Sequence, residues 1–325
     1  MKFRIVLAML LTQLPQSALA EKLSVALDWT LNTNHVGLVA AQAQGFYAKE
    51  GLEVELLPFS DTSSTALLAA GAADFGYLTA LGYLTAKASG AEIVALWATM
   101  QHETGRLVYN ADNPEITRPA ELSGKVYAGF GTAWEAALIG TMIRQDGGEP
   151  VWDTVTLGTG AYEALAAGAV DFTLEVATWE GVNGALLGRN QNAFRYADYG
   201  VPDQHNGYIA TQSARLAGEP ERVAAFMRAT RAGYAWALSN PDAAAELLIS
   251  KGNFPNPALV HGSMQAIVEG GFMGAEELGR IDPERFTAMA KFLYDANVLK
   301  DATGAALVWP GDVSAWVKQD WLLTQ

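Results

Sequence analysis

The most informative absence in this 325-residue chain is cysteine, of which it has none. The lack of thiols excludes disulfide bonds, thiolate metal sites, a catalytic cysteine and a lipid-modified N-terminal cysteine. Basic residues are scarce too, because 21 Lys and Arg stand against 35 Asp and Glu, a formal net charge of −14. Nucleic acids and anionic membranes bind through basic patches, so this charge argues against both as partners.

Long apolar runs are absent after the first twenty residues, where no segment approaches the roughly 20 residues that a membrane-spanning helix needs. Residues 1–20 contain two positive charges, an apolar stretch from Ile5 to Leu11, and the small-residue ending Ala18-Leu19-Ala20. This arrangement predicts a cleaved secretory signal peptide. We therefore expect a periplasmic protein without a lipid anchor.

Motifs for catalysis and metal binding are also missing. The G-x-S-x-G turn of a nucleophilic hydrolase does not occur. The four histidines stand singly, without the spacing of metal ligands: His35, His102, His205 and His261. Gly129-Phe130-Gly131 follows a predicted strand, but Trp134 takes the place of the third glycine of a dinucleotide-binding loop. The sequence thus predicts no catalytic residue, no metal and no cofactor.

Strands and helices alternate along the first two thirds of the chain, which is typical of parallel βαβ units. The octapeptide LAAGAADF at 68–75 recurs at 165–172 as LAAGAVDF, with seven of eight positions identical. In each copy a glycine ends a helix and an Asp-Phe pair opens a buried strand. Chance similarity in an alanine-rich chain is the alternative explanation. The repeat predicts two similar α/β lobes.

We expect each lobe to be a doubly wound, mostly parallel sheet flanked by helices. About 305 residues follow the leader, more than the roughly 250 to 300 at which a single core stops growing. The predicted lobes are residues 21–108 with 203–325, and residues 109–202. We expect the chain to return to the first lobe near Gly207–Thr211, so that two crossing strands form a hinge. The almost purely helical stretch after Glu219 must pack on an existing sheet.

The stretch Ala26–Gly37 reads ALDWTLNTNHVG and places an indole and several hydrogen-bonding side chains between a strand and a helix. Such connections lie at the carboxyl edge of an open α/β sheet, where ligands bind. Taken singly, an aromatic residue here is more often core, and an acidic residue at a helix start usually just favours the helix dipole. The candidate ligand-binding residues are Asp28, Trp29, Asn32, Asn34, His35, Tyr77, Gly131, Thr132, Glu175, Trp179 and Glu180. Of these, Gly131 and Thr132 are expected to offer free backbone N–H groups.

Six segments together resemble the family of thiamine-pyrimidine synthases and nitrate-, sulfonate- and taurine-like solute-binding proteins. They read DWTLNTNHVG, AQAQGFYAKEGLEVE, AAGAADFG, ELSGKV, TWEGV and YGVPD, in the family's order over residues 23–215. The resemblance is greatest to formylaminopyrimidine-binding proteins of ABC transporters. It implies the two-lobed type II periplasmic-binding fold, with a pyrimidine ring held by the residues that map to Trp29, Asn34 and Glu180. Leu31 replaces the family's usual proline, which leaves the identity of the ligand open.

The resemblance implies a monomeric solute-binding protein that captures a thiamine-precursor pyrimidine and delivers it to an ABC permease at the inner membrane. Riboflavin and an alkylsulfonate or taurine are alternative ligands, although a sulfonate calls for Arg or Lys in the cleft. A pyrimidine synthase of the same family is the alternative activity. Its Lys and His correspond to Leu78 and Gly82 here, and its cysteine-rich iron motif cannot form without cysteine. We therefore expect a binding protein and not an enzyme.

Overall fold

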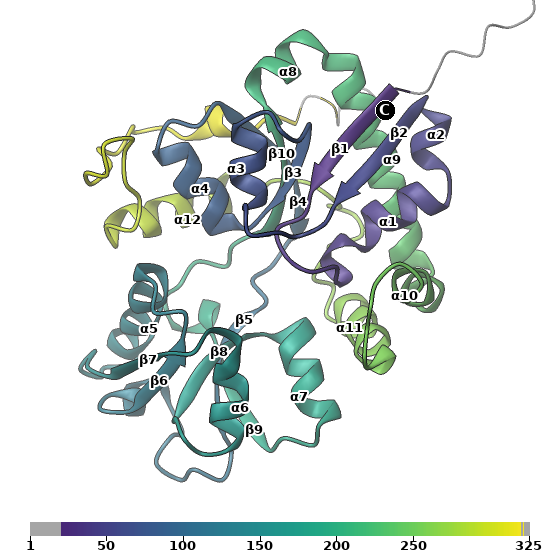
Figure 1. The fold of residues 1–325 in the computed structure, drawn as a ribbon. Coiled ribbons are helices and arrows are strands. Elements are labelled where there is room, and N and C mark those ends of the chain that lie inside the picture. The colour runs from purple at the N-terminus through teal and green to yellow at the C-terminus, as the bar shows by residue number, and fades with distance from the viewer. Residues whose placement is uncertain (1–20, 320, 322–325) are drawn as a thin grey trace, which may run out of the picture.

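The structure is a computed structural model that describes residues 21–319 and residue 321, so the predicted signal peptide lies outside the described residues. Two lobes are joined by two chain crossings (Figure 1). Their sheets have the strand orders β2-β1-β3-β10-β4 and β7-β6-β8-β5-β9. In each sheet the first three strands are parallel, and the remaining pairings are antiparallel. The sheets are therefore mixed, and the expected parallel arrangement holds for three strands of each.

The elements of the two lobes are as follows. The first sheet contains β1 (Glu21–Ala26), β2 (Leu52–Leu57), β3 (Phe75–Leu78), β4 (Ile93–Met100) and β10 (Asn206–Gln212). The second contains β5 (Gly105–Asn110), β6 (Val126–Gly129), β7 (Asp153–Thr156), β8 (Phe172–Val176) and β9 (Gln191–Arg195). The first lobe's helices before β10 are α1 (Val36–Ala43), α2 (Phe46–Lys49), α3 (Ser64–Ala69) and α4 (Ala80–Ala88). The second lobe has α5 (Ala133–Gln145), α6 (Ala161–Ala166) and α7 (Val182–Leu186).

The sequence repeat corresponds to one structural device used in both lobes. Gly71 and Gly168 end their helices with φ of 73° and 70°, values that favour glycine. The aspartate of each copy then accepts a backbone N–H from the strand alongside. Asp74 Oδ2 lies 2.7 Å from the Ser24 nitrogen in β1, and Asp171 Oδ2 lies 2.8 Å from the Val126 nitrogen in β6. Since β1 and β6 hold equivalent places in their sheets, the repeat reflects a shared architecture and not chance composition.

The boundary between the lobes differs from the expected one. Because β5 pairs with β8 and β9, residues 105–108 belong to the second lobe, whereas the sequence assigned them to the first. The predicted boundary lies too far towards the C-terminus because β5 follows β4 without a helix between them, so the sequence does not mark the change of lobe. The two crossings are residues 101–104 and 200–205. Strand β10 then enters the first sheet between β3 and β4, as expected for Gly207–Thr211.

The helices after β10 complete the first lobe, as expected. They are α8 (Ser213–Gly218), α9 (Pro220–Ser239), α10 (Pro241–Ile249), α11 (Pro257–Glu269) and α12 (Pro283–Asp295), and the last four begin with proline in the first turn. Helices α9 to α11 pack with α1 in one hydrophobic core, and α12 packs with α4 in a second. Figure 1 shows α11 and α12 at the two ends of the first lobe that approach the second. No helix in the described part of the chain is long and apolar enough to span a membrane.

Candidate functional site

A pocket of about 150 Å³ lies between the lobes. The start of α4 and Met289 of α12 line it from the first lobe, and the start of α5 and the end of β8 line it from the second. Both chain crossings form its base. The lining residues are Thr79, Ala80, Leu81, Glu103, Gly105, Trp134, Leu174, Glu175, Val176, Tyr196, Gln204, Asn206 and Met289. Of the predicted binding residues, all of which the structure describes, Glu175 alone lines this pocket. Among these thirteen lining residues there is no Arg, Lys or His.

The loop after β1 is held by its own side chains. Asn32 caps the short 3₁₀ helix that follows, because its Oδ1 accepts the Asn34 N–H at 2.9 Å. His35 is fully buried, and its Nδ1 accepts the Asn32 N–H at 3.3 Å. The proton must then be on Nε2, which donates to Asp28 Oδ1 at 2.9 Å. Asn32 and His35 are therefore structural residues that orient the Asp28 carboxylate.

Aromatic side chains stand exposed on equivalent loops of the two lobes. Trp29, after β1, is 42% exposed and lies against Phe59, after β2, with ring centroids 4.9 Å apart. In the second lobe Phe130 follows β6 and is 46% exposed. The sequence interpretation missed Phe59 and Phe130, although Phe130 directly follows β6, which holds the place of β1 in the second sheet. These rings provide apolar faces on both lobes at the carboxyl ends of the strands.

Tyr77 is placed in the core. Its side chain is fully buried, and its ring meets the His35 ring edge-on with centroids 4.7 Å apart. Its hydroxyl occupies the space over Gly207, where an added Cβ would lie 2.1 Å from that oxygen. Tyr77 therefore supports the loop after β1 through its contact with His35. Its position at a strand end made it resemble a ligand contact, but the neighbouring β10 covers it.

A carboxylate accepts hydrogen bonds from the backbone N–H groups at the start of α5. Thr132 is the N-cap, and its hydroxyl accepts the Glu135 N–H at 3.2 Å. Glu135 is only 3% exposed, and its two oxygens accept the N–H groups of Thr132 and Phe130 at 2.7 and 2.9 Å. The expectation that Thr132 offers a free N–H is therefore wrong, because a capping box satisfies it. Gly131 remains exposed, with φ of 72°.

A buried ion pair lies at the end of β8. Glu175 is 3% exposed, and its Oε1 accepts from the Arg106 Nε on the neighbouring β5. Burial raises the pKa of Glu175, and the charge of Arg106 opposes this without overcoming it. Gly181 makes room for the pair, because an added Cβ would lie 2.4 Å from Arg106 Nη2. Glu175 is thus committed to Arg106, and that guanidinium is only partly available to a ligand.

Trp179 and Glu180 lie on the π-helical turn Ala177–Gly181 that follows β8. Trp179 packs across the lobes, with its ring edge-on to Phe254 at a centroid distance of 6.3 Å. Glu180 Oε2 accepts the Val176 N–H at 3.1 Å. Burial raises the pKa of Glu180, and the negative charge of Glu175 adds to the effect, while backbone N–H groups lower it. Glu180 is therefore an acceptor whose charge is poorly solvated.

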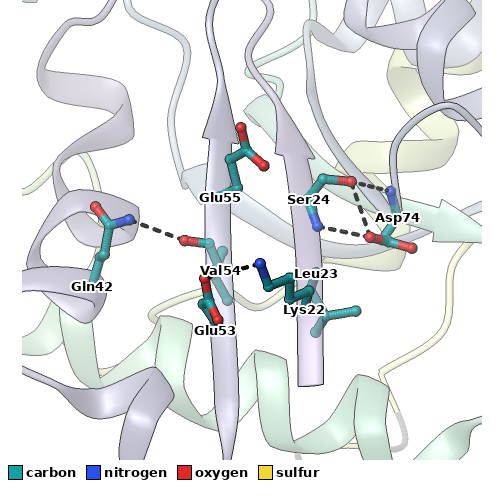
Figure 2. Close-up of a pocket in the computed structure, with 8 residues that line it drawn as sticks. All are labelled: Lys22, Leu23, Ser24, Gln42, Glu53, Val54, Glu55 and Asp74. Atoms are coloured by element: carbon teal, nitrogen blue, oxygen red, sulfur yellow. Dashed lines mark hydrogen bonds and ion pairs between the residues drawn. The ribbon is translucent and has the colours of Figure 1, made fainter. Parts of the chain in front are cut away.

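A second hollow, of about 400 Å³, lies along β1 and β2 (Figure 2). Its polar groups bind one another: Ser24 Oγ donates to Asp74 at 2.9 Å, and Gln42 donates to the Val54 carbonyl at 3.0 Å. It also flanks the amino-terminal half of β1, whereas ligands of open α/β sheets bind at the carboxyl ends. We therefore assign the candidate site to the pocket between the lobes.

A family model described as NMT1/THI5 like matches residues 32–244, which is more than half of the chain. The chain belongs to the NMT1/THI5-like family. The resemblance seen in the sequence motifs is thereby confirmed. Among similar proteins, a formylaminopyrimidine-binding protein of Halalkalibacterium halodurans is 27% identical over 72% of this chain and 73% of its own length. A 4-amino-5-hydroxymethyl-2-methylpyrimidine phosphate synthase of Legionella pneumophila is 24% identical over 71% of this chain and 74% of its own.

Among solved structures, the periplasmic aliphatic sulphonate binding protein SsuA of Escherichia coli superposes with a TM-score of 0.67. The match covers 86% of this chain and 88% of SsuA, at 16% identity. At that identity the likeness shows the fold alone. This NMT1/THI5-like protein therefore has the two-lobed periplasmic-binding architecture that its sequence predicts.

Proposed function

We propose that this NMT1/THI5-like protein is the periplasmic solute-binding component of an ABC importer, and that its ligand is a small aminopyrimidine of thiamine-precursor type. The two-lobed fold with a pocket at its hinge supports a role in ligand capture. A formylaminopyrimidine-binding relative supports the ligand class. The predicted signal peptide supports the compartment, and the partner would be an inner-membrane permease.

The observation that best supports an aminopyrimidine is the chemistry of the cleft lining. Gln204 lines the pocket with a carbonyl oxygen that has no partner within the described chain, and Glu180 lies on the turn just after β8. Glu103 and Glu175 line the pocket too, but they are engaged by Gly105, Gln204 and Arg106. Carboxylates and amide carbonyls accept hydrogen bonds, and a ligand with amino groups supplies the donors. A ligand that takes up a proton at a ring nitrogen would also compensate the negative charge of Glu180, which is poorly solvated.

A sulfonate fits this lining less well. Sulfonate groups are recognised by donors, Arg above all, but Arg106 is engaged by Glu175. Arg195 is exposed and borders a separate hollow beside the hinge. Riboflavin, a fused three-ring ligand, is bound by neither of the relatives named above as far as their names state. We therefore rank both ligands below a pyrimidine.

Capture would proceed by rotation of the lobes about the two crossings. Closure would bring Trp29 and Phe59 of the first lobe towards Phe130 of the second, so that the ring stacks between aromatic faces. The free oxygen of Asp28 and the carboxylate of Glu180 would bind its polar edge. Affinities from micromolar to nanomolar require about 8 to 12 kcal/mol, which a stacked ring and several charge-assisted hydrogen bonds can supply.

A synthase activity has less support, although relatives with that name exist. The positions corresponding to its Lys and His are Leu78 and Gly82, neither of which has a functional group on its side chain. Lys87, further along α4, donates its Nζ to the Ala91 carbonyl at 3.0 Å and is thereby held at the end of the helix. We propose that the protein binds its pyrimidine without transforming it.

Calorimetry of the purified protein tests the proposal. The probes are 4-amino-5-hydroxymethyl-2-methylpyrimidine, its formylamino derivative, riboflavin and taurine. We expect binding of a pyrimidine, and a tenfold or greater loss in Glu180→Gln, because the substitution removes the charge but keeps an acceptor for the Val176 N–H. Glu55→Gln, on the exposed edge of β2, is the matched control. Binding of taurine without any heteroaromatic ligand would refute the proposal.

A further inference from the structure

The two chain crossings are tied together at the base of the cleft. The Glu103 N–H on the first crossing donates to Asp203 Oδ1 on the second at 2.8 Å. His102 Nδ1 lies 2.8 Å from the other oxygen of the same carboxylate. Groups near a hinge axis move least when two rigid lobes rotate. Side chains on these crossings therefore keep their places in the open and closed states.

Glu103 fixes the orientation of the Gln204 amide. Its Oε1 accepts the Gly105 N–H at 2.7 Å, and its Oε2 accepts from the Gln204 Nε2. A carboxylate offers acceptors only, so the amide nitrogen must face it and the amide oxygen must point away. The direction of the Gln204 carbonyl is thus set by a neighbour and not by chance rotation.

That carbonyl oxygen has no hydrogen-bond partner within the described chain. Gln204 is only 6% exposed, so bulk water does not replace the missing partner. Buried polar atoms without a partner are rare in folded proteins, and each calls for an explanation. Gln204 lines the pocket between the lobes, where a bound molecule would supply the donor.

We infer that Gln204, oriented by Glu103, is a specificity residue that selects ligands with an amino group and rejects those with a carbonyl oxygen at the same ring position. The inference rests on the proposed function, because it assumes a heteroaromatic ligand in this pocket. Leu81, Leu174 and Met289 form apolar walls around the same space, which suits the edge of a flat ring. The buried carbonyl would pair with an amino hydrogen and would repel a second carbonyl oxygen.

The experiment exploits the dependence of Gln204 on Glu103. In Glu103→Gln, Oε1 of the new side chain continues to accept the Gly105 N–H, so that its amino group faces Gln204. The Gln204 amide must then turn over, which puts its NH₂ in the place of the unpaired carbonyl oxygen. Calorimetry compares 4-amino-5-hydroxymethyl-2-methylpyrimidine with its 4-oxo counterpart in each protein. Glu55→Gln is the matched control, and thermal melting verifies that each variant is folded.

We expect the wild-type protein and the control to prefer the amino ligand by tenfold or more, since a site built to accept a hydrogen bond is left unpaired by the wrong ligand. The amino-to-oxo ratio should fall at least tenfold in Glu103→Gln. Should that variant not fold, Gln204→Met is used, and the two ligands should then bind nearly equally.

A merely structural role for the hinge pair would weaken both ligands equally and leave the ratio unchanged. That result, or equal binding of the two ligands by the wild-type protein, would overturn the inference and indicate that an ordered water satisfies Gln204. Failure of the wild-type protein to bind either pyrimidine would instead refute the proposed function.

Discussion

His205, on the second crossing, should make the stability of this protein depend on pH. Its ring is fully buried, with Nε2 accepting the Asp282 N–H at 2.8 Å and Nδ1 lying 3.3 Å from the Met100 carbonyl. Because Nε2 is an acceptor, the histidine is neutral with its proton on Nδ1. A second proton would have no partner on Nε2 and would turn this contact into a clash of donors.

Burial lowers the pKa of His205 to about 4, from 6.5 for a solvated histidine. The hydrogen bond to Met100 opposes this, the charge of Arg285 adds to it, and Asp282 and Asp203 oppose it. Between pH 4 and 6.5 the unfolded chain binds the proton more readily than the folded one, so acid favours unfolding. The contribution of neutral His205 to the free energy of unfolding amounts to about 3 kcal/mol. It is complete above pH 6.5 and is lost as the pH falls towards 4.

Urea denaturation of the wild-type protein and of His205→Gln at several pH values from 7 to 4 measures this contribution. The comparison is needed because burial raises the pKa of Glu103, of Glu175 and of Glu180, which gives stability the opposite pH dependence. We expect the stability advantage of the wild-type protein over the variant to shrink by about 2 to 3 kcal/mol on acidification.

The control is His261→Gln, at a surface position beside Glu246, whose pH-dependent difference should stay within about 1 kcal/mol. Parallel curves for the wild-type protein and His205→Gln would refute the reasoning, because they would mean that the folded protein accommodates the protonated ring.

Three further predictions concern the repeat, the helix packing and the cleft. Asp74→Ala and Asp171→Ala should each cost about 1 to 3 kcal/mol, since each leaves a strand N–H unpaired. The loss should be larger for Asp74, which also pairs with Arg215, and equal losses in urea denaturation would contradict a role for that pair. Gly37→Ala should cost about 2 to 3 kcal/mol, because its Cβ would lie 2.0 Å from the Tyr234 ring, whereas Gly218→Ala, with no atom within 4 Å, should melt like the wild-type protein. Gly181→Ala should displace Arg106 and weaken pyrimidine binding about tenfold in calorimetry; Gly160→Ala, whose Cβ meets only Leu157 at 3.8 Å, should bind normally.

The order of the strands and helices followed from local patterns. Glycine stops, alternating apolar residues and the LAAGA-x-DF repeat act within a few residues, so a sequence displays them directly. The equivalence of the lobes was therefore predictable, and β3 and β8 lie where the sequence placed them. The boundary between the lobes was predicted wrongly, after residue 108, since the pairing of β5 with β8 is a long-range contact that local patterns do not reveal.

The same distinction between local patterns and long-range contacts applies to the binding site. The sequence by itself determined which loops reach the carboxyl ends of the strands, and so it placed Trp29, Glu175 and Glu180 near a cleft. Only the tertiary structure decided what each side chain does there. Tyr77 is buried because β10 covers it. The Thr132 N–H is hydrogen-bonded to Glu135, and Glu175 forms an ion pair with Arg106 on a neighbouring strand. Gln204 has no local motif, because its role depends on Glu103, a residue 101 positions away that only the folded hinge brings within hydrogen-bonding distance.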